Sequence, residues 1–260
     1  DRTKTNFNFK RKIINSIPIN YIAPSKWVLE VAKKCVIHQD STIHLLNNAV
    51  DSEFFHETKK VKKNKNLFKI VTCAAGFKFN PYKDLGSVLS SFKAISKIFE
   101  VKLIVIGEKK NNFPGLEKYN IEFHDHIFDV NKIIDIIRRC DVLVHSSNIE
   151  TWGYTVTEAL SLGIPVIASN VGGLRDQVKG YKVKHINNCR DNVFSINEAN
   201  GFLFEKKNIN QLSYFLKYMI TNERKKMIMS KNAKRHALEN YGLKKHMDNF
   251  IKICQNIKKL

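Results

Sequence analysis

Two short apolar runs, with a polar loop and a helical segment between them, constrain the fold of this chain more than any other feature. Residues 141–145 and 165–169 each indicate a buried strand, and residues 156–162 indicate a helix that ends at Gly163. Parallel strands need a crossover of this kind, and strands buried on both faces are continuously apolar. The segment therefore predicts a parallel sheet. Its polar loop should lie at the carboxyl edge of the strands, where open α/β sheets bind ligands.

The alternation of strands and helices extends along most of the chain. Strands that alternate with segments of helical periodicity predict an α/β fold with a Rossmann-like, doubly wound parallel sheet. Residues 180–198 are polar and are expected to form a surface loop, and residues 243–258 indicate a terminal amphipathic helix. The other expected strands are residues 67–75, 101–107 and 120–124, and the other expected helices are residues 85–98, 130–140 and two within residues 208–240.

The loop and helix between the two apolar runs carry two carboxylates, Glu150 and Glu158, eight positions apart. Backbone N–H groups at a helix N-terminus favour a phosphate, and Gly153 would let the backbone approach it. The carboxylate of Glu158 suits ribose hydroxyls, and that of Glu150 suits the hydroxyls of a sugar. Together these groups describe a nucleotide-sugar pocket. Glutamates at this spacing also occur by chance, and either one is then a solvated charge.

Residues 147–169 resemble the E-x7-E signature of family-4 retaining glycosyltransferases, which have the two-domain GT-B fold. Residues 171–176 resemble the Gly-Gly loop and helix start of that family, and residues 200–204 resemble the strand that follows. Residues 22–27 and 48–55 resemble the segments that close the acceptor domain and enter the interdomain linker. The resemblance extends over most of residues 20–260.

The resemblance implies that the chain is the C-terminal, donor-binding domain of such an enzyme together with the tail of its N-terminal acceptor domain. Residues 1–50 are expected to be the remnant of a truncated acceptor domain, and residues 51–66 the linker. Residues 67–242 would form the donor domain, and residues 243–260 a helix that crosses back towards the acceptor domain. The implied reaction transfers a sugar from a nucleotide diphosphate sugar to an acceptor hydroxyl, with retention at the anomeric carbon, in polysaccharide or glycolipid biosynthesis.

The resemblance also implies the residues of the site. Glu150 and Lys83 are the expected catalytic residues: Glu150 would orient the donor sugar, and Lys83 would stabilise charge on the leaving diphosphate. Asp84 stands where the family has a glycine, and Lys78 is the candidate replacement for its arginine. A lysine in a loop can equally be solvated. The expected donor-binding residues are Lys78, Gly76, Gly107, Ser147, Gly153, Tyr154, Thr155, Val156 and Glu158.

No metal or cofactor is expected. The sequence has no Asp-x-Asp motif, and its nine histidines show no ligand spacing. Its five cysteines are scattered and include no C-x-x-C pair, which suits a reducing cytoplasm. The helix N-terminus and the lysines would supply the positive charge that a metal supplies elsewhere, so we expect a metal-independent hexosyltransferase.

A net charge of +20 suits nucleic acid, an anionic membrane or an acidic substrate as partner, and it can equally reflect a genomic bias towards lysine. The densest basic run, at residues 59–65, is a solvated linker or a contact with anionic lipid headgroups. We therefore expect a cytoplasmic protein, with peripheral membrane contact and a sugar or lipid-linked acceptor as further expectations. Nucleic acid is not an expected partner, because aromatic residues are not interleaved with the basic ones. Two alternatives stay open: a non-catalytic basic module that docks on anionic membrane or nucleic acid, and a phosphorylase or sugar-phosphate synthase with the GT-B fold.

Overall fold

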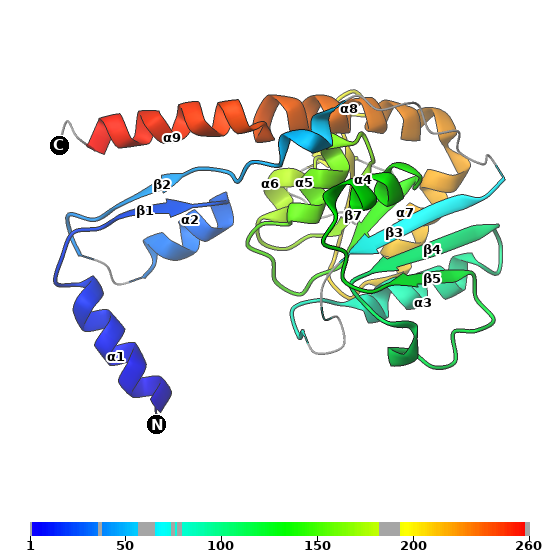
Figure 1. Ribbon diagram of the computed structural model, residues 1–260, viewed down its shortest axis with the longest axis horizontal. Helices are drawn as coiled ribbons and strands as arrows, with labels where there is room; N and C mark the ends of the chain where they lie inside the picture. Colours follow the sequence, from blue (N-terminus) through cyan, green and yellow to red (C-terminus); the bar gives the residue numbers. More distant parts are fainter. Residues whose placement is uncertain are drawn as a thin grey trace.

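The computed structural model describes residues 2–35, 38–56, 66–73, 76, 80–181 and 193–257. Within these residues two parallel sheets form: a small one with order β1-β2 and an eight-stranded one with order β5-β4-β3-β6-β7-β10-β8-β9. The α/β fold predicted from the sequence is confirmed (Figure 1). The strands are β1 (Asn20–Ala23), β2 (Thr42–Leu45), β3 (Phe68–Cys73), β4 (Val101–Ile106), β5 (Ile121–His124), β6 (Val142–His145), β7 (Val166–Ser169), β8 (Gly180–Tyr181), β9 (Val193–Phe194) and β10 (Gly201–Phe204).

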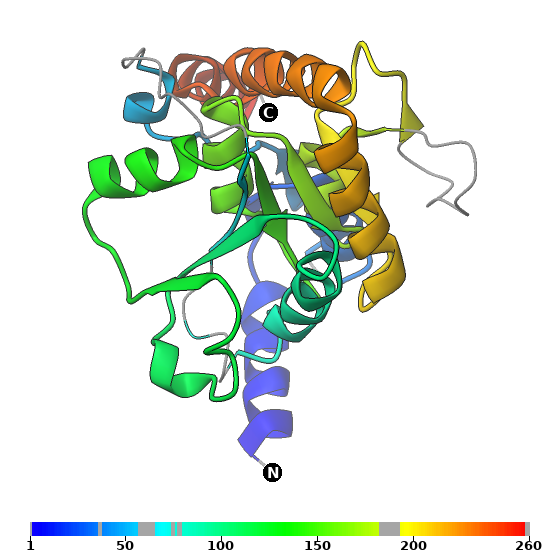
Figure 2. The ribbon, with the colours of Figure 1, turned by 90° about the vertical axis from the view of Figure 1, so that its right-hand side faces the viewer.

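Helices cover both faces of the large sheet, as a doubly wound fold requires (Figure 2). One buried cluster joins the sheet to α3 and α7, through side chains such as Phe92 and Phe215. The other cluster joins the sheet to α4, α5 and α8, through side chains such as Ile137, Leu160 and Ala237. The helices are α1 (Arg2–Ile14), α2 (Lys26–Lys33), α3 (Leu85–Ile95), α4 (Val130–Arg138), α5 (Tyr154–Ser161), α6 (Leu174–Gln177), α7 (Ile209–Thr221), α8 (Glu223–Tyr241) and α9 (Leu243–Ile257), with short 3-10 helices at Ser52–Phe55 and Lys110–Asn112.

The strand order reverses between β3 and β6, and this position determines where the site lies. From β3 the chain builds outward through β4 and β5, and it then returns so that β6 pairs with the other side of β3. The loops that follow β3 and β6 therefore leave the same edge of the sheet side by side. This is the topological switch point at which open α/β sheets bind ligands.

Helices α1 and α9 extend away from the large sheet, on the side of the small sheet (Figure 1). Both expose apolar side chains, among them Phe7 and Phe9 on α1 and Met247 and Ile251 on α9. None of the described helices is long and apolar enough to cross a membrane. The assignment of the small sheet and α9 to an acceptor-domain interface stays a prediction.

Two sequence predictions need correction. Residues 180–198 are not a loop throughout, because β8 and β9 pair with each other at the edge of the large sheet. Helix α5 begins at Tyr154, two residues before the predicted start, because Gly153 is extended and serves as the N-cap. The intervening residues 182–192 lie outside the described residues, as do the basic run at residues 59–65 and Lys78.

Candidate functional site

The loops after β3 and β6 are bonded to each other at the switch point. Lys83 and Ser147 form an antiparallel bridge, and the backbone N–H of Asn148 donates to the carbonyl of Tyr82 at 2.7 Å. Asp84 caps α3 by accepting from the backbone N–H of Ser87 at 3.0 Å. A capping carboxylate stabilises a helix start, which gives Asp84 a structural reason to occupy the position where the resembled family has glycine.

This pairing brings Lys83 against Glu150, two residues that lie 67 positions apart in the chain. The ammonium of Lys83 forms an ion pair with the carboxylate of Glu150, and Nε2 of His145 lies 3.0 Å from the same carboxylate oxygen. Burial alone would raise the pKa of Glu150, but the hydrogen bonds and charges of His145 and Lys83 outweigh it and lower the pKa to about 2. Glu150 is therefore a carboxylate at neutral pH, and its side chain is held from two directions.

His145 is a site residue that the sequence interpretation missed. It ends β6, is 4% exposed, and its Nδ1 lies 3.2 Å from the hydroxyl of Thr155. Burial lowers the pKa of His145, so the ring is neutral near pH 7. A carboxylate only accepts hydrogen bonds, so Nε2 carries the proton and donates to Glu150, while Nδ1 accepts from Thr155. The one sequence signal for His145 was a polar residue at the carboxyl end of an apolar run.

Glu158 lies in the second turn of α5 and is partly buried. Its carboxylate makes no hydrogen bond to any described residue, and burial raises its pKa to about 7. The nearby Cys73 ends β3, and its own pKa is raised first by burial and then by the charge of Glu158. A partly buried carboxylate that lacks a donor is costly, and hydroxyl donors from a ligand would remove that cost.

The N-terminus of α5 supplies free backbone donors. Among the described residues, none accepts a hydrogen bond from the N–H groups of Tyr154 or Thr155, and such groups attract anions. The N–H of Val156 donates to the carbonyl of Gly153 at 3.1 Å, and its part in donor binding stays a prediction. For Gly153 the structure gives a different reason from ligand approach: a Cβ would lie 3.0 Å from the side chain of Leu174.

The two other predicted glycines lie together at the carboxyl ends of β3 and β4. Gly76 and Gly107 have φ angles of 69° and 96°, which side chains rarely adopt, and the N–H of Gly76 donates to the carbonyl of Gly107 at 3.5 Å. The structure thus places Gly76 and Gly107 along the same edge of the sheet as Lys83 and Ser147. Lys78, the predicted replacement for the family arginine, cannot be placed because it lies outside the described residues.

The backbone of the Glu150 loop is fixed by close contacts. The hydroxyl of Ser169 accepts from the N–H of Ser147 at 3.0 Å and donates to the carbonyl of Ser147 at 2.8 Å. The N–H of Gly173 donates to the carbonyl of Glu150 at 2.9 Å. A Cβ on Gly172 would lie 2.0 Å from that carbonyl oxygen, so only glycine allows this approach. Gly172 and Gly173 therefore pack directly against the backbone of the Glu150 loop.

Trp152 anchors the same loop on its other side. Its side chain is 4% exposed and packs edge-on against Tyr241 at 5.3 Å between ring centroids. Tyr241 ends α8, and its carbonyl accepts from the N–H of Val50 at 2.9 Å.

The described residues contain no cluster of three or more side chains suited to a metal ion.

A parallel α/β sheet with a polar site at its switch point defines a class of nucleotide-binding folds, and comparison with known proteins specifies it further. Residues 54–236 match the model of the family described as glycosyl transferases group 1, and the chain belongs to that family. Its structural neighbours are glycosyltransferases of the GT-B fold. Sucrose-phosphate synthase from Thermosynechococcus elongatus is 15% identical with a TM-score of 0.75, over 98% of this chain and 62% of that one. Anabaena HepE, solved in complex with UDP-glucose, is 17% identical with a TM-score of 0.69, over 98% and 68% of the two chains.

Two curated relatives show how much of a longer protein this chain matches. It is 25% identical over 198 residues to trehalose synthase of Thermococcus litoralis, which covers 69% of this chain and 42% of that protein. It is 30% identical over 120 residues to an Escherichia coli UDP-Gal:alpha-D-GlcNAc-diphosphoundecaprenol alpha-1,3-galactosyltransferase, over 45% and 26% of the two proteins. The chain thus spans less than half the length of these curated relatives.

Proposed function

We propose that the chain forms the donor-binding part of a retaining glycosyltransferase that transfers a sugar from a nucleotide diphosphate sugar to an acceptor hydroxyl. The observation that carries the proposal is the arrangement of two carboxylates around the start of α5. Glu150 is ionised and held by Lys83 and His145, whereas Glu158 has no donor among the described residues. One carboxylate is thus positioned and the other is open to a ligand.

Each group then has a role on a nucleotide sugar. The free N–H groups of Tyr154 and Thr155 would donate to the diphosphate, and the ammonium of Lys83 would contact it from the loop after β3. Glu158 would accept from the ribose hydroxyls, which lie on the nucleoside side of the diphosphate. Glu150 would accept from hydroxyls of the transferred sugar on the opposite side. Lys83 would then bridge the sugar-binding carboxylate and the phosphate.

In the transfer step the bond from the anomeric carbon to the diphosphate oxygen breaks, and negative charge grows on the diphosphate. Lys83 and the N–H groups at the start of α5 stabilise that charge, and because they are held before the reaction they need not reorganise. The acceptor oxygen forms the new bond on the face from which the diphosphate leaves, and its proton goes to the departing phosphate oxygen or to solvent. Retention at the anomeric carbon follows from that shared face.

We extend the proposal to the setting of the reaction. A metal is not required, since Lys83 and the helix N-terminus supply the positive charge, and no cofactor takes part. The expected acceptor is a sugar or lipid-linked sugar in polysaccharide or glycolipid biosynthesis, and the net charge of +20 suits peripheral contact with an anionic cytoplasmic membrane face. Relatives with names of this kind, such as Staphylococcus aureus CapM, a capsular polysaccharide biosynthesis glycosyltransferase, support the pathway.

The test is a panel of nucleotide sugars measured by thermal stabilisation of the protein, with and without a chelator. We expect one nucleotide sugar to raise the melting temperature equally in both conditions. If no nucleotide sugar stabilises the protein, the function is wrong; if stabilisation needs Mg²⁺ or Mn²⁺, only the metal-free claim is wrong. Analysis of the product then separates a glycosyltransferase from a phosphorylase, which would transfer to inorganic phosphate, and from a synthase that transfers to a sugar phosphate.

A further inference from the structure

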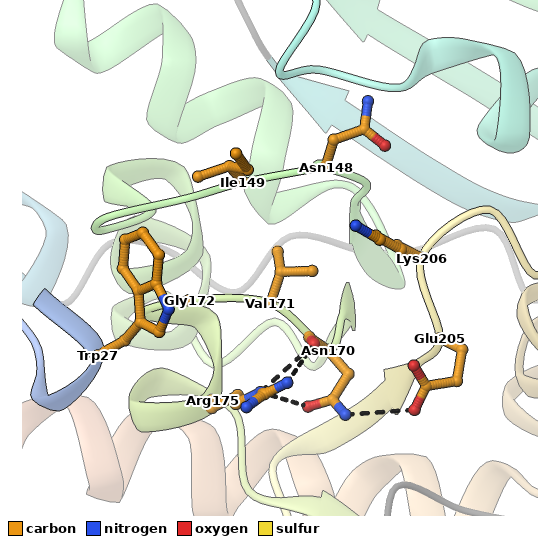
Figure 3. Close-up of a pocket in the computed structure, with 9 residues that line it drawn as sticks. All are labelled: Trp27, Asn148, Ile149, Asn170, Val171, Gly172, Arg175, Glu205 and Lys206. Atoms are coloured by element: carbon orange, nitrogen blue, oxygen red, sulfur yellow. Dashed lines mark hydrogen bonds between the residues drawn. The ribbon is translucent and has the colours of Figure 1, made fainter. Parts of the chain in front are cut away.

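A small cavity lies beside the Glu150 loop, between α2 and the loops that follow β6, β7 and β10 (Figure 3). Its volume is about 270 Å³, and none of Lys83, His145 or Glu158 lines it. The cavity is therefore separate from the groups assigned to the nucleotide. Ligand sites for drug-sized molecules are usually about 300–1,000 Å³, so this cavity suits a single ring rather than a nucleotide.

The cavity has an apolar side and a polar side. Trp27 and Ile149 lie on one side, and Asn170, Glu205 and Lys206 lie across from them (Figure 3). A pyranose has the same division, since its C–H groups form apolar faces and its hydroxyls form a polar rim. An aromatic ring offers contact area at little entropic cost, and planar amide and carboxylate groups bond to neighbouring hydroxyls.

The indole is held over the cavity by the start of its helix. Ser25 is fully buried and caps α2 by accepting from the N–H of Val28 at 3.3 Å. The N–H of Lys26, which directly precedes Trp27, donates to Oδ2 of Asp176 at 2.6 Å. Asp176 belongs to α6, so this contact ties Trp27 to the elements that form the rest of the cavity. The aromatic wall is thus fixed relative to the polar one.

The polar wall is also formed in advance. The guanidinium of Arg175 donates from Nη2 to the carbonyl of Asn170 and from Nε to Oδ1 of Asn170, both at 3.0 Å. The amide of Asn170 then donates to the carboxylate of Glu205 at 3.4 Å (Figure 3). Side chains that are already ordered lose less entropy when a ligand binds. This network lets Asn170 and Glu205 present hydroxyl-binding atoms without rearrangement.

Lys206 completes the rim. Its ammonium forms no hydrogen bond or ion pair with any described residue, and Figure 3 shows the side chain reaching over the cavity. The next residue, Lys207, has a φ of 65°, and the turn is closed by the N–H of Asn208, which donates to the carbonyl of Glu205 at 2.9 Å. A left-handed conformation is unfavourable for a residue other than glycine, and this turn is what places Lys206.

The cavity is joined to the Glu150 loop through the backbone. Asn148 and Ile149 line it and directly precede Glu150, while Gly172, in its floor, packs against the carbonyl of Glu150. A group in the cavity thus lies next to the loop that carries the sugar-binding carboxylate. We propose that this cavity binds one pyranose unit of the acceptor glycan, with its apolar face on Trp27 and its hydroxyls on Asn170, Glu205 and Lys206. That this pyranose belongs to an acceptor rests on the proposed function, whereas the binding of a pyranose does not.

The test is a titration of the protein with the methyl α- and β-glycosides of glucose, galactose and N-acetylglucosamine, followed by saturation-transfer NMR and tryptophan fluorescence. The variants are Trp27→Leu and Lys206→Met. The matched control is Lys217→Met, an exposed lysine of α7 that does not line the cavity. Glu158→Gln serves as a variant of the nucleotide site, and nucleoside diphosphate binding is measured for every variant.

We expect at least one glycoside to bind and to quench the fluorescence of Trp27. Its affinity should fall about tenfold in Trp27→Leu and several-fold in Lys206→Met, and it should not change in Lys217→Met or Glu158→Gln. Nucleoside diphosphate affinity should not change in the two cavity variants. The inference is overturned if no glycoside binds, if both cavity variants bind as well as the wild type, or if binding is lost in Glu158→Gln instead. Failure of nucleotide sugars to bind the wild type overturns the proposed function alone.

Discussion

Nucleotide-sugar binding should depend on pH, because it should follow the ionisation of Glu158. Burial raises the pKa of this carboxyl to about 7, and its carboxylate has no hydrogen-bond donor among the described residues. The proposed contact to ribose needs the ionised form, which accepts two hydroxyl hydrogen bonds. Affinity should therefore rise with pH through about 7 and level off above it.

The magnitude follows from the ionised fraction. With a pKa of about 7 this fraction falls about tenfold between pH 8 and pH 6, so affinity should fall by about the same factor. The limit is set by the energy of the contacts, because hydrogen bonds to a charged group contribute about 1.5–3 kcal/mol each. Glu158→Gln keeps the shape but not the charge, so it should bind more weakly at pH 8 and show a flat profile.

The assay is calorimetric titration with a nucleotide sugar rather than a nucleoside diphosphate, because the terminal phosphate of the latter titrates near the same pH. Two neighbouring groups of the site, Glu150 and His145, titrate on the acid side of Glu158. Glu150 has a pKa of about 2, and burial lowers the pKa of His145. A flat profile in the wild type, or an equally steep profile in Glu158→Gln, would refute the ribose contact.

The folded-state pKa of Glu158 is raised from 4.5 to about 7, so the folded chain binds the proton more tightly than the unfolded chain. The free energy of unfolding should therefore fall by about 3 kcal/mol as pH rises through that window. Denaturant melts at a series of pH values measure this slope, and Glu158→Gln should abolish it. Glu150→Gln should reduce turnover at least tenfold while nucleoside diphosphate affinity stays within about twofold, and loss of both together would mean that the residue supports the loop. Gly172→Ala should destabilise the chain by more than about 2 kcal/mol in urea melts, because its Cβ would lie 2.0 Å from the carbonyl oxygen of Glu150. The control is Gly86→Ala, whose Cβ would meet its nearest atom at 3.5 Å. Lys83→Met should weaken nucleoside diphosphate binding equally with and without a chelator, and full rescue by Mg²⁺ would contradict the role of this lysine.

Local sequence patterns were sufficient to predict the sheet and its helices. Continuous apolar runs such as residues 101–107 and 141–145 can be buried only between helix layers, and their spacing leaves room for parallel crossovers. The position of the site at the carboxyl edge of the sheet followed from the same runs. The exceptions were short: β8 and β9 have two residues each, so neither could show a periodicity.

The partners within the site could not be predicted in the same way. Lys83 and Glu150 were both singled out, but their ion pair depends on β6 pairing with β3, which no local pattern records. His145 stands at the end of an apolar run, and one polar residue at the end of a predicted strand says little about whether it belongs to a site. The cavity beside Trp27 combines residues of α2 with three loops of the large sheet, and only the folded backbone brings these together.

Trp152 shows how the site depends on packing outside it. This residue lies two positions after Glu150, and its ring contacts Tyr241, whose carbonyl holds the N–H of Val50 and whose hydroxyl donates to the carbonyl of Asp176 at 3.3 Å. Asp176 in turn accepts from the N–H of Lys26 at 2.6 Å, so α2 and the segment at Val50 are both bonded to residues on the Tyr241 side of Trp152. Protein interiors are packed as closely as organic crystals. A shift of Tyr241 must therefore displace Trp152 or break the contact between the two rings, and in both cases the change reaches the backbone next to Glu150.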